Sequence, residues 1–170
     1  SVVSHASCPV VVVREDNHVT DSTKYGPVVV GVDGSEVSQK ATAYAFREAQ
    51  ARGAALIAVH TWMDMQVQAS LAGLSAAQSE WADIEKEQSE LLAENLKEPR
   101  EEYPDVEVKQ LITRDRPVSA LTEAAEGAQL LVVGSHGRGG FKGMLLGSTS
   151  RALLQSAPCP MMVVRPDEDN

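Results

Sequence analysis

The chain has 170 residues, and its 15 Lys and Arg residues against 24 Asp and Glu residues give a formal charge of −9. This acidic balance disfavours general binding to nucleic acid or to an anionic membrane surface, because like charges repel. The length predicts one domain whose core needs neither disulfides nor a structural metal, and no apolar run approaches the roughly 18 residues of a membrane span. Cys8 and Cys159 have no metal or redox spacing, so we expect free thiols in a reducing cytoplasm.

A repeat links the two ends of the chain. The segment from Cys8 to Arg14 matches the segment from Cys159 to Arg165 at an offset of 151, and the residues just before each segment match at the same offset. Chance similarity between two apolar strands is the alternative, and the shared Cys-Pro and terminal Arg argue against it. We therefore expect four parts: the last helix end and strand of a preceding domain (1–14), a polar linker (15–25), a complete domain (26–166) and a tail (167–170).

From residue 26 onward, short β-branched runs alternate with helical periods. Strands are predicted at 27–32, 55–60, 106–112, 129–134 and 160–165. The first of them is apolar throughout, which is typical of a parallel sheet buried on both faces. We expect His60 to end the second strand as the entry to a loop.

Helices are predicted between these strands. Ser35 caps the first, which runs to Gly53, Pro117 opens a later one, and Ser148 caps the last. The long helix in the middle is expected to bury one face, with Leu74, Ala77, Trp81, Ile84, Leu91 and Asn95 on it, and to stop near Pro99.

The alternation predicts an α/β fold, a doubly wound five-stranded parallel sheet in the order 3-2-1-4-5. The strand at 160–165 would then lie at an edge with open backbone groups. We expect 10–14 to add an extra antiparallel strand there, in the same chain or from a neighbouring copy. This pairing would place Cys8 near Arg165 and Cys159 near Arg14, too far apart for a disulfide.

Ligands of such sheets bind at the carboxyl ends of the strands where the winding reverses. Asp33-Gly34-Ser35 and the glycine-rich stretch 134–147 would meet there. Glycines let backbone N–H groups approach an anion and adopt positive φ, and the helix start at Ser148 adds unpaired N–H donors, so phosphate is the natural guest. The alternative is a tight strand-to-helix connection with no ligand. The stretch fits neither the P-loop nor the dinucleotide fingerprint, which would need glycine at Lys142.

The spacing G-x2-G-x9-G-[ST], together with Val-Asp-Gly-Ser at 32–35 and Cys-Pro at 159–160, resembles the universal stress protein family over 26–166. It is most similar to the ATP-binding branch, and the leading fragment resembles the end of another such domain, as in the tandem actinobacterial members. The resemblance implies that ATP binds, with Mg²⁺ held by its phosphates.

The resemblance also implies roles for individual residues. Asp33 would hold the ribose hydroxyls or the adenine, unless it only caps the helix. The other implied contacts are Gly31 and Val59 for the base, Val133 and Gly134 for the ribose, and Gly137, Gly147, Ser148 and Thr149 for the phosphates. Arg138 and Lys142 would supplement the phosphate contacts or remain solvated surface charges.

Three functions follow from these residues. A nucleotide-binding stress-response regulator with slow or no hydrolysis accounts for the complete glycine motif. An enzyme that hydrolyses ATP or transfers a phosphoryl or adenylyl group would need an aligned base and strong charge clamps, and the sequence offers only Asp33, His136 and flexible cations. A ligand-free dimerisation module would resemble the family branch whose glycine motif is degraded. The expected partners are ATP and either a second universal stress domain or a second copy bound through the last strand.

Overall fold

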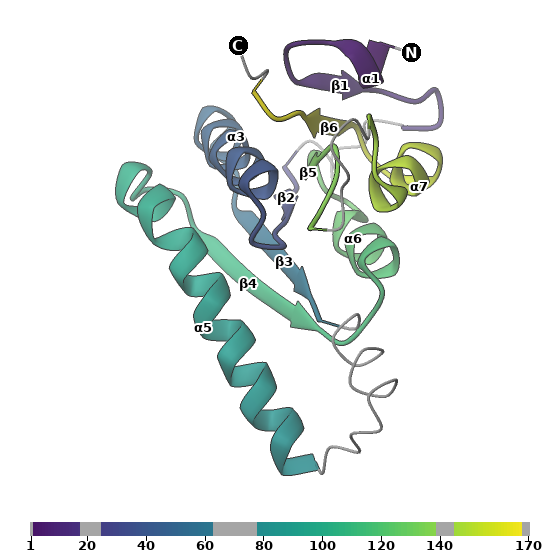
Figure 1. Ribbon diagram of the computed structural model, residues 1–170. Coiled ribbons are helices and arrows are strands. Elements are labelled where there is room, and N and C mark those ends of the chain that lie inside the picture. The colour runs from purple at the N-terminus through teal and green to yellow at the C-terminus, as the bar shows by residue number, and fades with distance from the viewer. Residues whose placement is uncertain (1, 18–24, 63–77, 139–144, 168–170) are drawn as a thin grey trace.

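The computed structural model describes residues 2–17, 25–62, 78–138 and 145–167, and it shows a sheet covered by helices on both faces (Figure 1). Within these residues the sheet has six strands in the order β1-β6-β5-β2-β3-β4. Their bounds are β1 Val10–Val12, β2 Val28–Gly31, β3 Leu56–Thr61, β4 Val108–Thr113, β5 Leu130–Gly134 and β6 Met161–Val164. All neighbouring strands are parallel except β1 and β6. The predicted α/β fold and the order 3-2-1-4-5, here β4-β3-β2-β5-β6, are confirmed.

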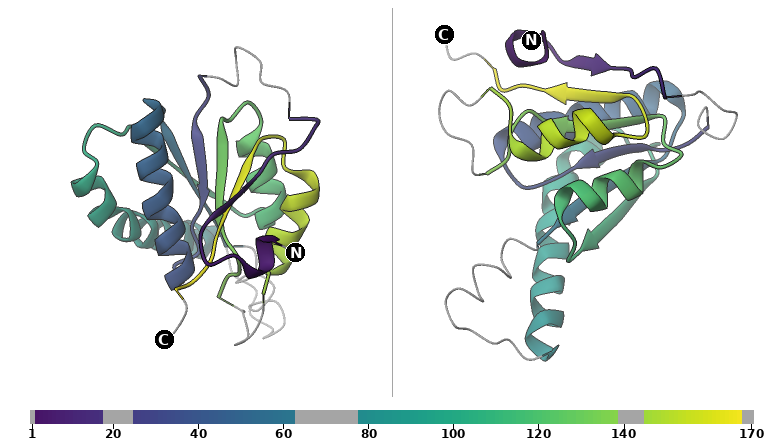
Figure 2. Two further views of the ribbon diagram at one scale, coloured as in Figure 1. Left: turned by 90° about the horizontal axis from the view of Figure 1, so that it is seen from above. Right: turned by 90° about the vertical axis from the view of Figure 1, so that its right-hand side faces the viewer.

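The helices divide between the two faces of the sheet (Figure 2). Their bounds are α1 Val2–His5, α3 Glu36–Arg52, α5 Gln78–Glu102, α6 Pro117–Ala125 and α7 Ser148–Ser156. Helices α3 and α5 pack on one face and α6 and α7 on the other, and each face has its own apolar core. None of the described helices is long and apolar enough to cross a membrane.

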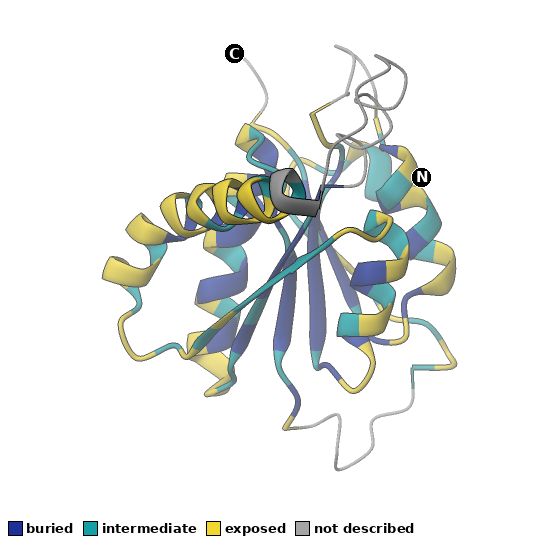
Figure 3. Ribbon diagram, turned by 90° about the horizontal axis from the view of Figure 1, so that it is seen from below, coloured by how far each residue is buried: buried dark blue, intermediate teal, exposed yellow. Residues whose placement is uncertain are grey.

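The central strands are apolar throughout because both of their faces are covered. Val28, Val29 and Val30 are all 0% exposed, and they alternate between the two cores. Figure 3 shows this buried centre as the dark blue strands. The carboxyl ends of β2, β3 and β5 therefore emerge together from a rigid core.

Helix α3 begins and ends where the sequence predicts. Ser35 Oγ accepts the backbone N–H of Ser38 at 3.2 Å, which satisfies one of the donors that a helix start leaves free. Gly53 closes the helix in the left-handed conformation, with φ 61°.

Helix α5 differs from the prediction at two points. It runs past Pro99 to Glu102, because Tyr103 stacks on Phe46 with ring centroids 6.2 Å apart and donates its N–H to the Pro99 carbonyl at 2.9 Å. Leu91, which we expected on the buried face, is 46% exposed. The buried stripe is instead Gln88, Leu92 and Leu96; Leu74 and Ala77 lie outside the described residues.

Strand β1 adds the extra antiparallel strand that we expected. Val10, Val11 and Val12 pair with Val163, Met162 and Met161. The same register, continued in both directions, sets Cys8 opposite Arg165 and Arg14 opposite Cys159, and both cysteines are free. This confirms the predicted pairing.

The register has the symmetry of a two-fold axis. Val11 lies opposite Met162, which is its own equivalent at the offset of 151 in the repeat. On either side of this pair, Val10 lies opposite Val163, the equivalent of Val12, and Val12 lies opposite Met161, the equivalent of Val10. The α1 helix corresponds in the same way to the last residues of α7.

Candidate functional site

The residues that the resemblance implies for the base and ribose meet at the carboxyl ends of β2, β3 and β5. Gly31 lies opposite Val59 in the β2–β3 register. A Cβ on Gly31 would lie 3.3 Å from Leu121 of α6 and 3.7 Å from Val133 Cγ1. Val59 and Val133 are 2% and 5% exposed and belong to the core beneath α6. The structure thus brings Gly31, Val59 and Val133 together.

Asp33 follows β2 and is held in a turn. Its Oδ1 accepts the backbone N–H of Ser35 at 2.8 Å, and its own N–H donates to Ser38 Oγ at 3.0 Å. Gly34 has φ 82°, a left-handed conformation that favours glycine. Among the described residues, the hydrogen bonds of this carboxylate go to Oδ1, so the turn uses one carboxylate oxygen and leaves Oδ2 for another partner.

The loop after β5 folds over this turn. A Cβ on Gly137 would lie 2.6 Å from Asp33 Oδ2, and a Cβ on Gly34 would lie 2.7 Å from Arg138 Nη2. The carboxylate therefore packs on Gly137, and the guanidinium of Arg138 packs on Gly34. The structure brings Gly137 to Asp33 and Arg138 to Gly34 of the same turn, whereas Lys142 lies outside the described residues.

Two further glycines join β5 to α7. Gly147 donates its N–H to the Ser135 carbonyl at 2.6 Å, and Ser150 Oγ donates to the Gly134 carbonyl at 2.6 Å. A Cβ on Gly147 would lie 3.1 Å from His136 Cα. Gly147 is needed because two backbone segments pack closely here, and its N–H group is already used.

The positive φ that we expected in the glycine-rich stretch is absent from its described part. The described glycines with positive φ are Gly34, Gly53 and Gly127. The glycines at the two ends of the stretch serve close approach rather than a left-handed backbone.

Helix α7 begins one residue away from the expected cap. The N-cap residue is Gly147, with φ −74° and ψ 165°, and Ser148 is the first helical residue, so the prediction that Ser148 caps the helix is wrong. The first helical bond runs from the Arg151 N–H to the Gly147 carbonyl at 3.0 Å. Among the described residues no side chain caps this helix, and its first turn has no acidic residue, which favours an anion at the N–H groups of Ser148 and Thr149 and at the positive end of the helix dipole.

His60 has a role that the sequence analysis missed. It lies within β3, is 8% exposed, and contacts the Val32 carbonyl through Nδ1 at 2.8 Å and Gln88 Oε1 through Nε2 at 2.7 Å. The expectation of a loop-entry residue is wrong because α5 covers this end of β3. The histidine would stand out in the sequence only if its polar partner on α5 were known.

An aromatic cluster lies beyond the ends of β3 and β4. The rings of Trp62 and Trp81 are 5.6 Å apart, and the Arg114 guanidinium lies 5.5 Å and 5.7 Å from their centroids. Trp62 is 2% exposed. The cluster anchors the first turns of α5 to the sheet through cation–π contacts.

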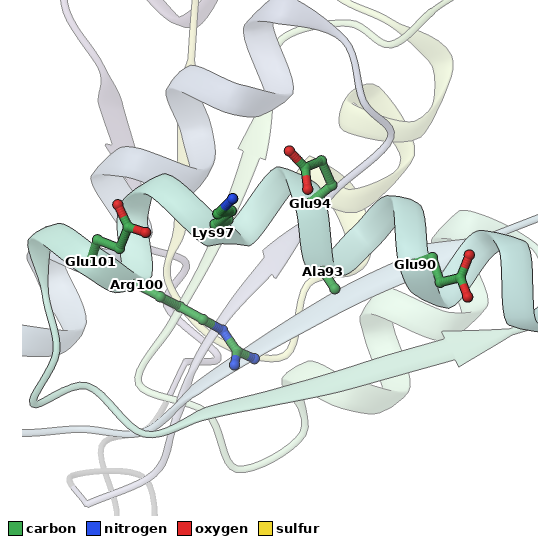
Figure 4. Close-up of a pocket in the computed structure, with 6 residues that line it drawn as sticks. All are labelled: Glu90, Ala93, Glu94, Lys97, Arg100 and Glu101. Carbon is green, nitrogen blue, oxygen red and sulfur yellow. The ribbon is translucent and has the colours of Figure 1, made fainter.

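A surface hollow of about 480 Å³ lies elsewhere, along α5. Its lining residues come from successive turns of this one helix, and their side chains do not converge on a point (Figure 4). They are Glu90, Ala93, Glu94, Lys97, Arg100 and Glu101. A single helix face without converging groups is no binding site, so the strand ends remain the candidate site.

Residues 24–165 match the universal stress protein family. The universal stress protein Rv2005c of Mycobacterium tuberculosis is 47% identical over 165 residues, which cover 97% of this chain and 54% of that protein. The chain spans about half the length of the curated relatives that it matches.

Solved structures share the fold. A universal stress protein in complex with cAMP has a TM-score of 0.56 at 25% identity and covers 83% of this chain and 97% of that one. The universal stress protein from Archaeoglobus fulgidus in complex with dAMP has a TM-score of 0.57 at 23% identity, covering 82% of this chain and 98% of that one. The family match over most of the length and the close relatives agree, and the chain belongs to the universal stress protein family.

Proposed function

We propose that the chain binds an adenine nucleotide, ATP in particular, at the carboxyl edge of the sheet and acts as a stress-response regulatory module. In this proposal Asp33 Oδ2 receives the ribose hydroxyls or the adenine, and Gly31, Val59, Val133 and Gly134 border the nucleoside. The first turn of α7, with Ser148 and Thr149, receives the phosphates.

The observation that carries the proposal is that the residues after β5 contact both Asp33 Oδ2 and the start of α7, two groups without a hydrogen-bonding side chain among the described residues. Gly137 touches Asp33 Oδ2, and the neighbouring His136 packs against Gly147 at the start of α7. A carboxylate suits ribose hydroxyls, and a helix N-terminus suits phosphate. Neighbouring residues of one loop thus contact the carboxylate of Asp33 and the start of α7, which suits the two ends of a nucleotide.

The fit also demands a movement. Gly137 and Arg138 pack on the turn formed by Asp33 and Gly34. A nucleotide that binds Asp33 must therefore move the loop with Gly137 and Arg138 away from this turn. Arg138 is exposed and would then turn from Gly34 toward the phosphates. Gly147 would contribute space rather than a hydrogen bond, because its N–H is engaged by Ser135.

Magnesium would enter with the nucleotide. Among the described residues, no group of three or more His, Cys, Asp or Glu side chains could hold a metal ion, and Mg²⁺ commonly binds through substrate phosphates. The universal stress proteins solved with cAMP and dAMP support an adenine nucleotide as the class of ligand.

Regulation is favoured over catalysis by the surroundings of His136. Its Nδ1 lies 3.1 Å from Ser135 Oγ, but Ser135 is 0% exposed and cannot act as an accessible nucleophile. Fast phosphoryl transfer needs an aligned base and strong charge clamps. We therefore propose slow or no hydrolysis, and a turnover of about 1 per second or more would contradict it.

The experiment is calorimetric titration of the chain with Mg-ATP, preceded by mass spectrometry of any nucleotide that copurifies. The Gly137→Val variant should lose measurable binding because its side chain would occupy the space beside Asp33 Oδ2. A matched control, Ser156→Val, adds the same branched side chain at the exposed far end of α7 and should bind like the parent. Equal binding by Gly137→Val and the parent would refute the site.

A second universal stress domain is the partner that we propose at β1, with a second copy of the chain as the alternative. The repeat, the two-fold register of β1 and β6, and the half-length coverage of the relatives support it. The outer side of β1 exposes Val11 and Val13 at 46% and 66%, an apolar strip beside an open strand edge. The free cysteines favour a cytoplasmic location.

A further inference from the structure

Buried polar side chains surround the strand end that carries Asp33. His60, Gln88 and Ser38 are 8%, 3% and 3% exposed. Burial of polar groups is costly unless each is hydrogen-bonded, so their partners identify what they are for.

His60 holds one end of the peptide unit that precedes Asp33. Its Nδ1 lies 2.8 Å from the Val32 carbonyl oxygen. A carbonyl oxygen only accepts, so Nδ1 carries the hydrogen and donates it. Nε2 of the neutral ring then accepts, so the side-chain amide of Gln88 on α5, 2.7 Å from Nε2, fixes the ring from the other side by donating from its amide nitrogen.

Ser38 holds the other end of the same unit. Its Oγ accepts the Asp33 N–H at 3.0 Å. Ser38 is itself fixed within α3, because its N–H donates to Ser35 Oγ at 3.2 Å and its carbonyl accepts Thr42 Oγ1 at 2.8 Å.

The Val32 carbonyl and the Asp33 N–H belong to one planar peptide group. Hydrogen bonds from β3 and from α3 therefore fix the plane of this group at both ends. The plane sets the direction in which Asp33 leaves the backbone, and the Ser35 N–H then orients Oδ1. Oδ2 is left aimed at Gly137.

We propose that His60, held by Gln88, and Ser38 are positioning residues for Asp33, and that they set the nucleotide affinity of the candidate site without touching the nucleotide. This inference rests on the proposed function. The side chain that holds His60, Gln88, comes from α5.

Two substitutions at position 60 separate positioning from packing. In His60→Asn the amide nitrogen takes the place of Nδ1, whereas in His60→Gln it takes the place of Nε2. Calorimetry with Mg-ATP should show His60→Asn within about threefold of the parent and His60→Gln weakened about tenfold, the loss expected for one hydrogen bond to a group that must be held in place. Ser38→Ala removes the hydrogen bond at the other end of the peptide group, from the Asp33 N–H to Ser38 Oγ, and should also weaken Mg-ATP binding about tenfold.

Double variants that combine each substitution with Asp33→Ala separate positioning of Asp33 from a general structural role, because only positioning makes the loss of Mg-ATP affinity depend on Asp33. If His60 acts through Asp33, His60→Gln should cost nothing more in the Asp33→Ala background. Equal losses for His60→Asn and His60→Gln, or an undiminished loss in that background, would overturn the inference. Should His60→Gln fail to fold, the Ser38→Ala cycle decides the question by the same criteria.

Failure of the proposed function would appear separately, as a parent that binds no Mg-ATP. Hydrogen exchange of the Asp33 amide then tests, without nucleotide, whether His60 and Ser38 hold the peptide group between Val32 and Asp33 in place. Slow exchange in the parent and in His60→Asn, with faster exchange in His60→Gln, would support the hold on this peptide. Equal exchange in all three proteins would overturn it.

Discussion

A disulfide between β1 and β6 would test the two-fold register directly. Val11 lies opposite Met162, and the Cα atoms of directly opposed residues in antiparallel strands lie about 4.5–5.5 Å apart, within the range of about 4.4–6.8 Å for a disulfide. We therefore expect Val11→Cys with Met162→Cys, in a Cys8→Ser background, to crosslink on mild oxidation. Cys159 should not compete, because burial raises the pKa of its thiol to about 11 and keeps it protonated at neutral pH.

The size of the effect follows from the length of chain that the bond closes. About 150 residues separate the two positions, and constraining a loop of that length stabilises a protein by about 5 kcal/mol at most, less any strain in the bond. Denaturant unfolding of the oxidised and reduced forms measures this difference. We expect a value between about 2 and 5 kcal/mol.

The matched control shifts the pair by one residue. In Val11→Cys with Met161→Cys the two side chains point to opposite faces of the sheet, because successive residues of a strand alternate. It should crosslink poorly. Equal crosslinking of both pairs, or none in the first, would refute the register and with it the two-fold relation.

Cys8 should react with a thiol reagent at once and Cys159 only after unfolding, since they are exposed and buried respectively; equal rates in the folded protein would contradict the structure. The pKa of Cys159 is raised by burial from 9.0 to about 11, so its contribution to stability is complete below pH 9 and is lost as the pH approaches 11. Denaturant unfolding should show this loss in the parent but not in Cys159→Ala. Asp33→Ala should weaken Mg-ATP binding by about 1–3 kcal/mol in calorimetry, and unchanged affinity would leave Asp33 with its turn role only. Arg114→Ala should lower stability by about 0.5–1 kcal/mol and alter the fluorescence of the two tryptophans that flank the guanidinium; an unaltered spectrum would contradict the cation–π contacts.

Much of the fold could be predicted because its signals are local. A run such as Val28–Val30 is apolar at every position only if both of its faces are buried, so the sequence alone implies a covered parallel sheet. The pairing of β1 was predictable for a different reason. The repeat supplies two copies of one strand, and two copies related by a two-fold axis pair antiparallel about a shared centre, which is Val11 and Met162.

The buried face of α5 was not predicted correctly, because the first of its three buried residues is polar. Gln88 is buried, and it points inward because His60 on β3 needs a partner. The two residues are 28 positions apart, so neither explains the other in the sequence. A search for apolar periodicity therefore selects Leu91, which is exposed.

The contact between Asp33 and the glycine-rich loop was predictable from the sequence, and the local geometry of the loop was less so. Asp33 and Gly137 do meet, as residues at the carboxyl ends of neighbouring strands must. The uses of Gly147 and Ser148 were not predictable, because which residue ends the loop and which begins the helix depends on the hydrogen bond between Gly147 and Ser135. A motif specifies spacing, whereas that bond specifies the direction in which each N–H group points.

The two-fold symmetry between β1 and β6 holds for their backbone pairing but not for the side-chain contacts at the ends of the two strands. Arg165 Nη1 donates to the Ala6 carbonyl at 3.0 Å. By the offset of 151, the equivalent contact would join Arg14 to the carbonyl of Ala157. That contact is replaced by another.

The difference lies in the partners of two equivalent aspartates, Asp16 and Asp167. Asp16 holds Arg14 at 3.0 Å, and Asn17 Nδ2 reaches the Ala157 carbonyl instead, at 3.4 Å. Asp167, the equivalent of Asp16 at the offset of 151, pairs with Lys40 of α3 at 2.5 Å instead, and Arg165 contacts the Ala6 carbonyl. Backbone pairing needs only β-compatible residues in register, whereas each side-chain contact depends on which other residues lie within reach. The pairing of β1 with β6 therefore rests on the ladder between the strands, and the arginines at its ends are free to take different partners.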